Sequence, residues 1–139
     1  MTTIPDQVRK EWDTVRVREW WGIRLEAAAE GECRLGMKVL PEMVNRDDGT
    51  LHGGVIATLI DTSVAVAIST VYEVGVDIKG HTTCELNVSY LSAVLTPEAY
   101  VKARILRKGR TLVVGEASVY DQNDKLCATG RATYMVFKR

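Results

Sequence analysis

An apolar stretch near the middle of the chain limits the folds that this sequence can adopt. Residues 55–68 are apolar on every side of a helix, which indicates a helix enclosed by other elements. Asp61 is the only ionisable residue from Val55 to Thr70. A membrane span needs roughly 20 apolar residues and is disfavoured by a central carboxylate. The stretch therefore predicts a long helix in a protein core.

Two features of this helix are chemically useful. His52, Gly53 and Gly54 stand where the helix would begin, so backbone N–H groups at the positive end of the helix dipole are not covered by side chains. Such an end can hold an anion or an oxyanion. An isolated buried carboxylate costs several kcal/mol unless it is paired, hydrogen-bonded or protonated. Asp61 is therefore expected to have a partner or a function.

The spacing of these residues also predicts an assembly. Gly54 and Asp61 share a helix face to within ~20°, but they stand ~10 Å apart along the axis. One chain cannot bring them together. An antiparallel pair of helices across a two-fold axis would place Asp61 of the partner subunit beside the Gly54 N–H. This hypothesis predicts a homodimer with two identical shared sites.

Composition narrows the class of protein. The 139 residues predict one domain over residues 1–139, and 18 basic against 18 acidic side chains give no electrostatic reason to expect nucleic acid or a membrane surface as the main partner. Cys33, Cys84 and Cys127 lack metal or disulfide spacing and are interpreted as reduced core thiols. The two histidines likewise predict no metal centre. The first residues carry no apolar signal region, so a cytoplasmic location is expected.

Hydrophobic periodicity predicts the remaining elements. An amphipathic helix over residues 3–17, begun by a Thr3–Asp6 capping box, forms most of an N-terminal helical segment, residues 1–20. Alternation over residues 22–40 around Glu30-Gly31 predicts a hairpin. Four further strands are predicted as an antiparallel meander, at residues 81–92, 98–108, 111–121 and 125–137. The fold class is therefore α+β, with a curved antiparallel sheet wrapped around a long central helix.

Three motifs carry a resemblance to a known family. They are LHGGVIATLID at residues 51–61, SYLSAV at 89–94 and LRKGRT at 106–111. In this order they resemble the hotdog-fold acyl-CoA thioesterases, specifically the PaaI-like and thioesterase superfamily member 2-like group, over residues 20–137. The resemblance implies a hotdog fold that hydrolyses an acyl- or aryl-CoA to free acid and coenzyme A. It also implies a homodimer, with a homotetramer built from two dimers, and no cofactor besides the coenzyme A of the substrate.

The resemblance assigns roles to the residues around the helix start. The Gly54 N–H, with Gly53 nearby, would polarise the thioester carbonyl. Asp61 of the partner subunit would be general base or nucleophile. These roles agree with the chemistry, because thioester hydrolysis needs a stabilised oxyanion and an activated water or a covalent nucleophile.

The resemblance assigns supporting roles to three polar residues. His52 would orient the site, Asn45 would position substrate or water, and Thr83 would hold the attacking water. Each also has a structural interpretation, since His52 could simply close the loop before the helix, and Asn45 and Thr83 are common small polar residues.

A basic turn is a candidate for binding the phosphates of coenzyme A. Arg107, Lys108 and Arg110 surround Gly109, and guanidinium and ammonium groups pair well with phosphate. The other interpretation is a solvated hairpin tip, which is common for surface charge.

Two other functions compete with hydrolysis. One is a non-catalytic hotdog protein that binds acyl-CoA, against which the presence of Asp61 argues. The other is a hotdog hydratase or dehydratase, whose HFP-type segment this sequence lacks. A serine hydrolase is not supported, because no GxSxG motif is present.

Overall fold

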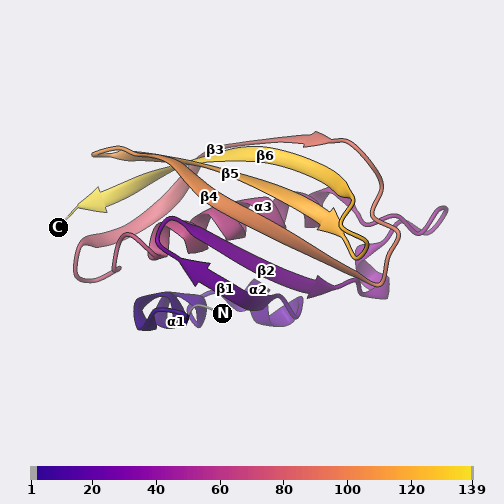
Figure 1. Cartoon of the computed structure of the whole chain (residues 1–139), viewed down its shortest axis with the longest axis horizontal. Helices are drawn as coiled ribbons and strands as arrows, with labels where there is room; N and C mark the ends of the chain where they lie inside the picture. The colour runs from indigo at the N-terminus through magenta and orange to yellow at the C-terminus, as the bar shows by residue number, and fades with distance from the viewer. Residues whose placement is uncertain (1–2, 139) are drawn as a thin grey trace.

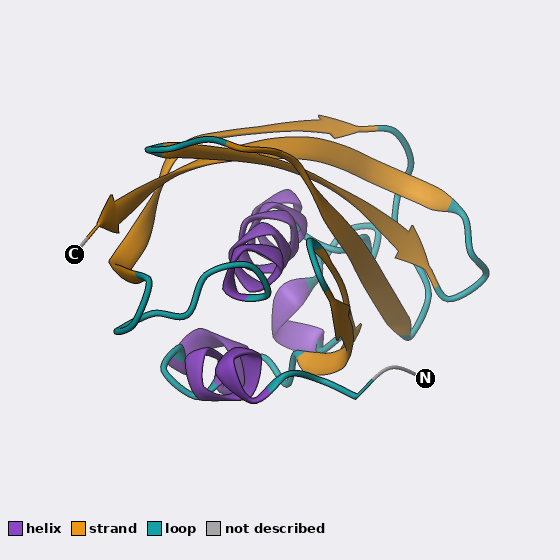
Figure 2. Cartoon of the chain, turned by 60° about the vertical axis from the view of Figure 1, so that its left-hand side comes forward, coloured by secondary structure: helices purple, strands orange, loops and turns teal. Residues whose placement is uncertain are grey.

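A curved antiparallel sheet folds around one long helix, α3 (Gly53–Ser69), in the computed structural model, which describes residues 3–138 (Figures 1 and 2). Leu59, Ile60 and Val64 of α3 are completely buried, so the prediction of an enclosed core helix is confirmed. The α+β class with a curved sheet is confirmed as well. Within residues 3–138, no helix combines the length and hydropathy needed to span a membrane.

The N-terminal segment forms two short helices instead of the single predicted one. They are α1 (Asp6–Trp12) and α2 (Arg16–Trp20), and they lie on the side of α3 that faces away from the sheet (Figure 2). Residues 13–15 (DTV) favour helices weakly, and the Thr14 hydroxyl donates to the Glu11 carbonyl at 2.7 Å. The predicted Thr3–Asp6 capping box is wrong, because the N-cap is Pro5 and has no side-chain hydrogen bond.

The break between α1 and α2 brings two opposite charges together. Arg18 turns back onto Glu11, and its Nη1 and Nη2 donate to the two carboxylate oxygens at 2.8 and 3.0 Å. Both side chains are almost fully buried. Losing one partner of such a pair would leave an uncompensated buried charge, so the pair fixes the angle between the two helices.

The predicted hairpin is confirmed as β1 (Arg24–Ala29) and β2 (Glu32–Lys38), joined at Glu30-Gly31. A β-bulge between Leu25 and Ala27 shifts the alternation of β1 by one residue. Ala28 therefore points into the core, where the simple alternation had placed Ala27 and Ala29. A short 3₁₀ turn, η1 (Pro41–Met43), follows β2.

The four predicted strands are present, but they do not pair as a simple meander. They are β3 (Ile78–Tyr90), β4 (Glu98–Lys108), β5 (Leu112–Asp121) and β6 (Leu126–Lys138), in a sheet ordered β1-β2-β4-β5-β6-β3. β3 thus forms an edge beside β6, and β4 lies next to the first hairpin. The connection from β3 to β4 crosses the start of α3, where the Leu51 N–H donates to the Val94 carbonyl at 3.0 Å.

The three cysteines are free thiols. Cys33 and Cys127 are buried as predicted, and burial raises the pKa of Cys33 to about 12, which makes its thiol unreactive. Cys84 is exposed, so its assignment to the core is wrong. It occupies the bulge of β3 between Thr83 and Glu85, and the extra residue of a bulge does not keep the inward–outward alternation.

Candidate active site

The N-terminal end of α3 is capped by a side chain. The Nδ1 atom of His52, the N-cap residue, accepts a hydrogen bond from the Gly54 N–H at 2.9 Å. The expectation that side chains leave this N–H uncovered is therefore wrong within one chain. Both His52 and Gly54 are exposed, so this end of the helix is open to solvent. His52 and Gly54 are brought together, as both interpretations of His52 require.

The two glycines keep the start of α3 open to close approach. A Cβ at Gly53 would lie 3.3 Å from the Tyr90 ring, and one at Gly54 would lie 3.0 Å from His52 Nδ1. The Tyr90 hydroxyl donates to the Gly53 carbonyl at 2.7 Å, which ties the end of β3 to the start of the helix. Side chains at these positions would crowd the surface where a substrate carbonyl would meet the N–H groups.

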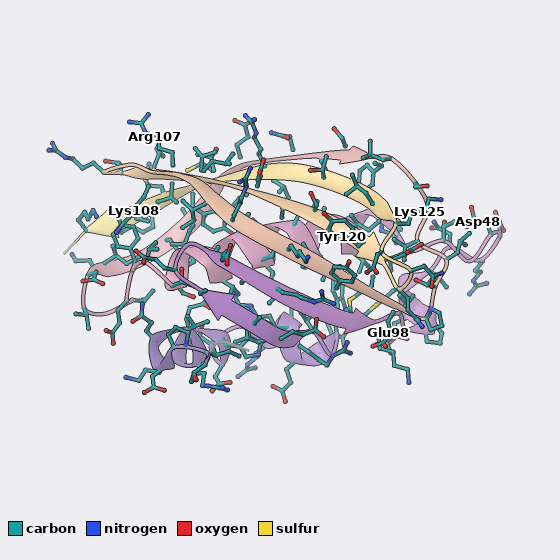
Figure 3. All side chains as sticks on the ribbon, viewed as in Figure 1. Asp48, Glu98, Arg107, Lys108, Tyr120 and Lys125 are labelled. Atoms are coloured by element: carbon teal, nitrogen blue, oxygen red, sulfur yellow. The ribbon has the colours of Figure 1, made fainter. Side chains whose placement is uncertain are left out.

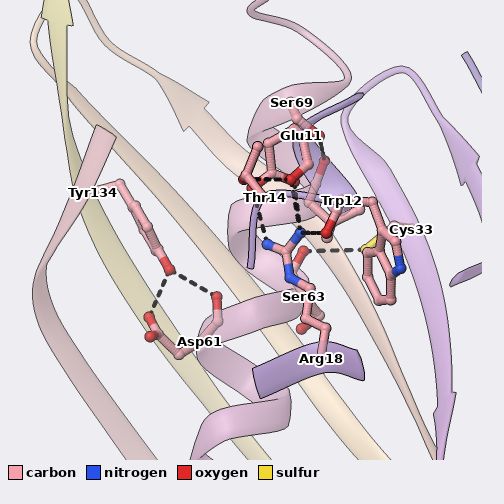
Figure 4. A network of polar contacts seen from close by, with 10 residues as sticks. Glu11, Trp12, Thr14, Arg18, Cys33, Asp61, Ser63, Ser69 and Tyr134 are labelled. Atoms are coloured by element: carbon pink, nitrogen blue, oxygen red, sulfur yellow. Dashed lines mark hydrogen bonds and ion pairs between the residues drawn. The ribbon is translucent and has the colours of Figure 1, made fainter. Parts of the chain in front are cut away.

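Asp61 is held by two hydroxyl groups, of which Figure 4 shows that of Tyr134. Thr83 Oγ1 donates to Asp61 Oδ1 at 2.8 Å, and Tyr134 Oη donates to the same oxygen at 2.7 Å. Tyr134 Oη also lies 2.9 Å from the Asp61 carbonyl oxygen. The carboxylate is half-buried rather than enclosed, so one of its oxygens remains available for chemistry.

Tyr134 is the residue of this cluster that the sequence did not single out as functional. Its position in β6 was predicted only as part of an inward-facing alternation. The register pairs Tyr134 with Thr83 across β6 and β3, and this places both hydroxyls over the same turn of α3. The missing signal was the pairing of β3 with β6, which the predicted meander did not contain.

The environment of Tyr134 keeps its hydroxyl protonated. Burial, followed by the neighbouring Asp61 carboxylate, raises the pKa of Tyr134 above its ordinary value. The His81 ring packs edge-on against Tyr134, with 5.3 Å between ring centroids. Burial lowers the pKa of His81, which keeps this imidazole neutral near pH 7. Tyr134 is therefore a permanent hydrogen-bond donor to Asp61.

Asn45 belongs to the loop before α3 in this structure. Its Nδ2 donates to Thr50 Oγ1 at 2.9 Å, and its backbone N–H donates to the Thr50 carbonyl at 2.9 Å. These bonds close the loop of residues 45–50. Among residues 3–138, Asn45 has no hydrogen bond to Asp61 or Thr83, so one chain does not join it to them.

The basic turn lies at the other end of the molecule from that loop. Figure 3 shows Arg107 and Lys108 at the β4–β5 turn and Asp48 at the opposite end. Lys108 Nζ donates to the Val71 carbonyl, just beyond the C-terminal end of α3, at 3.3 Å and lies 4.3 Å from the centre of the Tyr72 ring. Arg107 and Arg110 are exposed. These cations are therefore remote from Gly54 of their own chain.

The chain has a groove of about 510 Å³ on the outer face of β1, β2, β4 and β5. Its outward-facing lining includes Arg34, Lys102 and Glu116, and none of the predicted site residues lines it. The predicted site residues on α3, at His52–Gly54 and around Asp61, therefore lie apart from this groove.

Comparisons with known proteins agree with this architecture. A model of the Thioesterase superfamily matches residues 48–128. A Saccharolobus solfataricus protein, whose name assigns it provisionally as an esterase, is 32% identical over 117 residues, covering 84% of this chain and 75% of its own. Human acyl-coenzyme A thioesterase 13 is 34% identical over 115 residues, covering 80% of this chain and 77% of its own.

A solved structure extends the comparison to the fold. The E. coli PaaI protein from the phenylacetic acid degradation operon superimposes with a TM-score of 0.83 at 19% identity, covering 94% of this chain and 91% of that one. The chain therefore belongs to the Thioesterase superfamily and is a thioester hydrolase with a hotdog fold.

Proposed function

We propose that this hydrolase is an acyl-CoA thioesterase that converts an acyl- or aryl-CoA to the free acid and coenzyme A, in a site shared by two copies of the chain. The observation that carries the proposal is the Asp61 carboxylate, the one ionisable group of α3, which two hydroxyl groups hold by one oxygen. A carboxylate so placed can activate water or attack an acyl carbon. The substrate class is also the one named for the human relative.

The start of α3 would stabilise the charge that develops on the thioester oxygen. The substrate carbonyl oxygen would replace His52 Nδ1 as the acceptor of the Gly54 N–H, with Gly53 beside it. His52, released from this bond, would remain next to the carbonyl and orient it. Removing one preorganised N–H donor of this kind lowers the reaction rate by about 10²–10³-fold.

Asp61 would then complete the reaction. As a general base it would take a proton from water, whose oxygen attacks the acyl carbon; the C–S bond then breaks and Asp61 returns the proton to the leaving sulfur, which gives the thiol and the free acid. As a nucleophile its oxygen would bond to the acyl carbon while the C–S bond breaks and coenzyme A leaves as the thiolate; water then hydrolyses the resulting anhydride to the free acid and restores the carboxylate. Thr83 would support either route through the bond that it makes to Asp61. Neither route requires a metal or a redox cofactor.

The unpaired edge of the sheet supports the assembly of two chains. β3 has 13 residues, and within residues 3–138 the only strand of the sheet that pairs with it is β6, along one edge. A long open edge favours pairing with another strand. Two β3 edges related by a two-fold axis would set the α3 helices antiparallel and bring Asp61 of the partner subunit toward Gly54. Two such dimers would form the proposed homotetramer.

The same symmetry would give the basic turn a role. Because it lies near the C-terminal end of α3, an antiparallel partner would place Arg107, Lys108 and Arg110 nearer to the start of the first helix. The phosphates of coenzyme A would then meet these cations. Asn45 would contribute from its loop at the helix start.

The first experiment measures thiol release from a panel of acyl- and aryl-CoA substrates. Asp61→Asn should lower kcat/KM at least ~10²-fold, while the exposed control Asp13→Asn should keep the wild-type rate. Circular dichroism and light scattering check fold and assembly. An Asp61→Asn enzyme as fast as wild type would refute the mechanism. A wild-type chain that binds acyl-CoA without releasing thiol would establish the non-catalytic alternative.

A second experiment tests whether the site is shared. Asp61→Asn and Gly54→Val are each expected to be inactive, the latter because a branched side chain blocks the helix start. When the two are mixed at random by co-expression, half of the dimers contain both kinds of chain, and each of these has one intact site. About a quarter of the wild-type activity should therefore return. No recovery in verified mixed oligomers would show that both groups act within one chain.

A further inference from the structure

We infer that Tyr134 is a positioning residue for Asp61 and that Oδ2 is the carboxylate oxygen that takes part in the reaction. The inference rests on the proposed function and adds to it the orientation of the reacting group. It follows from where the hydrogen bonds to Asp61 fall, because both of the hydroxyl donors lie on the same oxygen.

The geometry distinguishes the two oxygens of Asp61. Oδ1 accepts from Thr83 Oγ1 at 2.8 Å and from Tyr134 Oη at 2.7 Å. Among the residues that the structure describes, no hydrogen bond is made to Oδ2. Because both donors bind Oδ1, the carboxylate cannot rotate about the Cβ–Cγ bond of Asp61 without losing both hydrogen bonds. Oδ2 therefore keeps its lone pairs free and in a fixed direction.

Tyr134 is itself held in place. Its side chain is almost fully buried in β6, its ring packs on the edge of His81, and its hydroxyl also lies 2.9 Å from the Asp61 carbonyl oxygen. Contact with both the backbone and the side chain of Asp61 fixes the distance from β6 to α3. Such support keeps a reacting group within the narrow range of positions that catalysis requires.

The other charged groups near this cluster leave Asp61 without an ionic partner. His81 comes from β3, Glu11 from α1 and Arg18 from α2. Glu11 acts electrostatically on His81, and Arg18 acts on both His81 and Tyr134. Glu11 and Arg18 are bound to each other, as Figure 4 shows beside the Tyr134–Asp61 contact. Within residues 3–138, no cation forms an ion pair with Asp61. The hydroxyl donors are therefore the groups that stabilise its charge.

The test is Tyr134→Phe, which keeps the ring and removes only the donor. The matched control is Tyr120→Phe in β5, where the ring stacks on Tyr100 on the outer face of the sheet. Tyr134→Phe should lower kcat about tenfold or more, because the lost bond is to a charged group, and should leave KM within about twofold. The acid limb of its pH–rate profile should move to higher pH, since a carboxylate with fewer donors binds its proton more tightly.

The control and a second variant make the inference falsifiable. Tyr120→Phe should match wild type in kcat and in the acid limb. A Tyr134→Phe enzyme with unchanged kcat and an unchanged acid limb overturns the inference, and so does one whose loss is entirely in KM. If Tyr134→Phe does not fold, Thr83→Val carries the test: a shift of the acid limb to higher pH supports the assignment of Oδ1 as the held oxygen, and an unshifted limb overturns it.

Failure here is distinguishable from failure of the proposed function. If Asp61→Asn is inactive and Tyr134→Phe behaves as wild type, the thioesterase mechanism stands and only the positioning role is lost. If Asp61→Asn is fully active, the mechanism itself is wrong, whatever Tyr134→Phe does.

Discussion

Strands β5 and β3 have similar apolar alternation but very different surroundings. In β5, every second residue from Val113 onward is buried, and Val119 has no exposed surface. In β3, Leu86 and Tyr90 point to the same concave side of the sheet as the inward residues of β6, yet they are 36% and 54% exposed. β5 lies directly over α3, whereas β3 is the edge beyond it (Figure 1).

Alternation of apolar residues thus identifies the inward face of a strand but not what covers that face. The apolar side of β5 is covered by this chain, so it contributes to the chain's own stability. The apolar side of β3 is left largely open by the same chain, and exposed apolar surface beside an open strand edge marks an interaction site. The comparison therefore separates positions needed for folding from positions that we expect to be needed for the proposed assembly.

Val119→Asp in β5 should have the largest effect. An unpaired carboxylate in a closed core costs several kcal/mol, which is comparable with the whole free energy of unfolding of a typical domain, about 5–15 kcal/mol. We expect the variant to be unfolded or aggregated, with no cooperative melting by circular dichroism. A folded Val119→Asp protein of near wild-type melting temperature would show that β5 is not a strand of the closed core.

Leu86→Asp in β3 should leave the fold intact and prevent assembly. The new carboxylate stays in water within one chain but would be buried between two. We expect wild-type circular dichroism, a smaller particle by light scattering, and thiol release reduced at least ~10²-fold, because the proposed site needs two chains. A variant that unfolds as Val119→Asp does would remove the distinction between the two strands.

The end of β3 that carries the partly buried His81 predicts a smaller, pH-dependent effect on the free energy of unfolding. Burial lowers the pKa of His81 from its ordinary 6.5, so below that pH the unfolded chain takes up a proton before the folded chain does. The free energy of unfolding should fall as the pH drops below 6.5, by at most about 1.4 kcal/mol per pH unit from this group. Above pH 6.5 both states are neutral, and His81 contributes no pH dependence.

His81→Phe provides the control for that measurement, since it keeps an aromatic ring against Tyr134 but does not titrate. Urea unfolding at pH 7.5 and at pH 5.5 should show a smaller loss of stability in the variant than in wild type. Equal losses in the two proteins would mean that this end of β3 is as open to solvent as the other end.

Much of the fold was predictable because it depends on local patterns. The enclosed helix, the first hairpin and the bounds of the four later strands follow from periodicity and turn residues. Two features were not predictable in this way. The bulge in β1 and the break between α1 and α2 both shift which residues face inward, and each depends on contacts with residues elsewhere in the chain.

The candidate site likewise contains residues that could be recognised from the sequence and residues that could not. Asp61 and the glycines at the start of α3 stand out in the sequence, because a carboxylate in an apolar helix and two glycines at its start need an explanation. The bond between His52 and Gly54 was one of the alternatives that the sequence left open. Tyr134 could not be recognised, since nothing local separates it from any other inward-facing aromatic residue.

Local patterns in the sequence were enough to predict the central helix, the strands around it and Asp61 as the candidate reacting carboxylate, because these depend on residues that are neighbours in the chain. The tertiary structure decided that β3 lies beside β6, that Tyr134 and Thr83 meet on one oxygen of Asp61, and that one face of β3 is left open. The physical reason is that strand order and long-range register are set by the packing of the whole sheet on α3, and no local pattern encodes that packing.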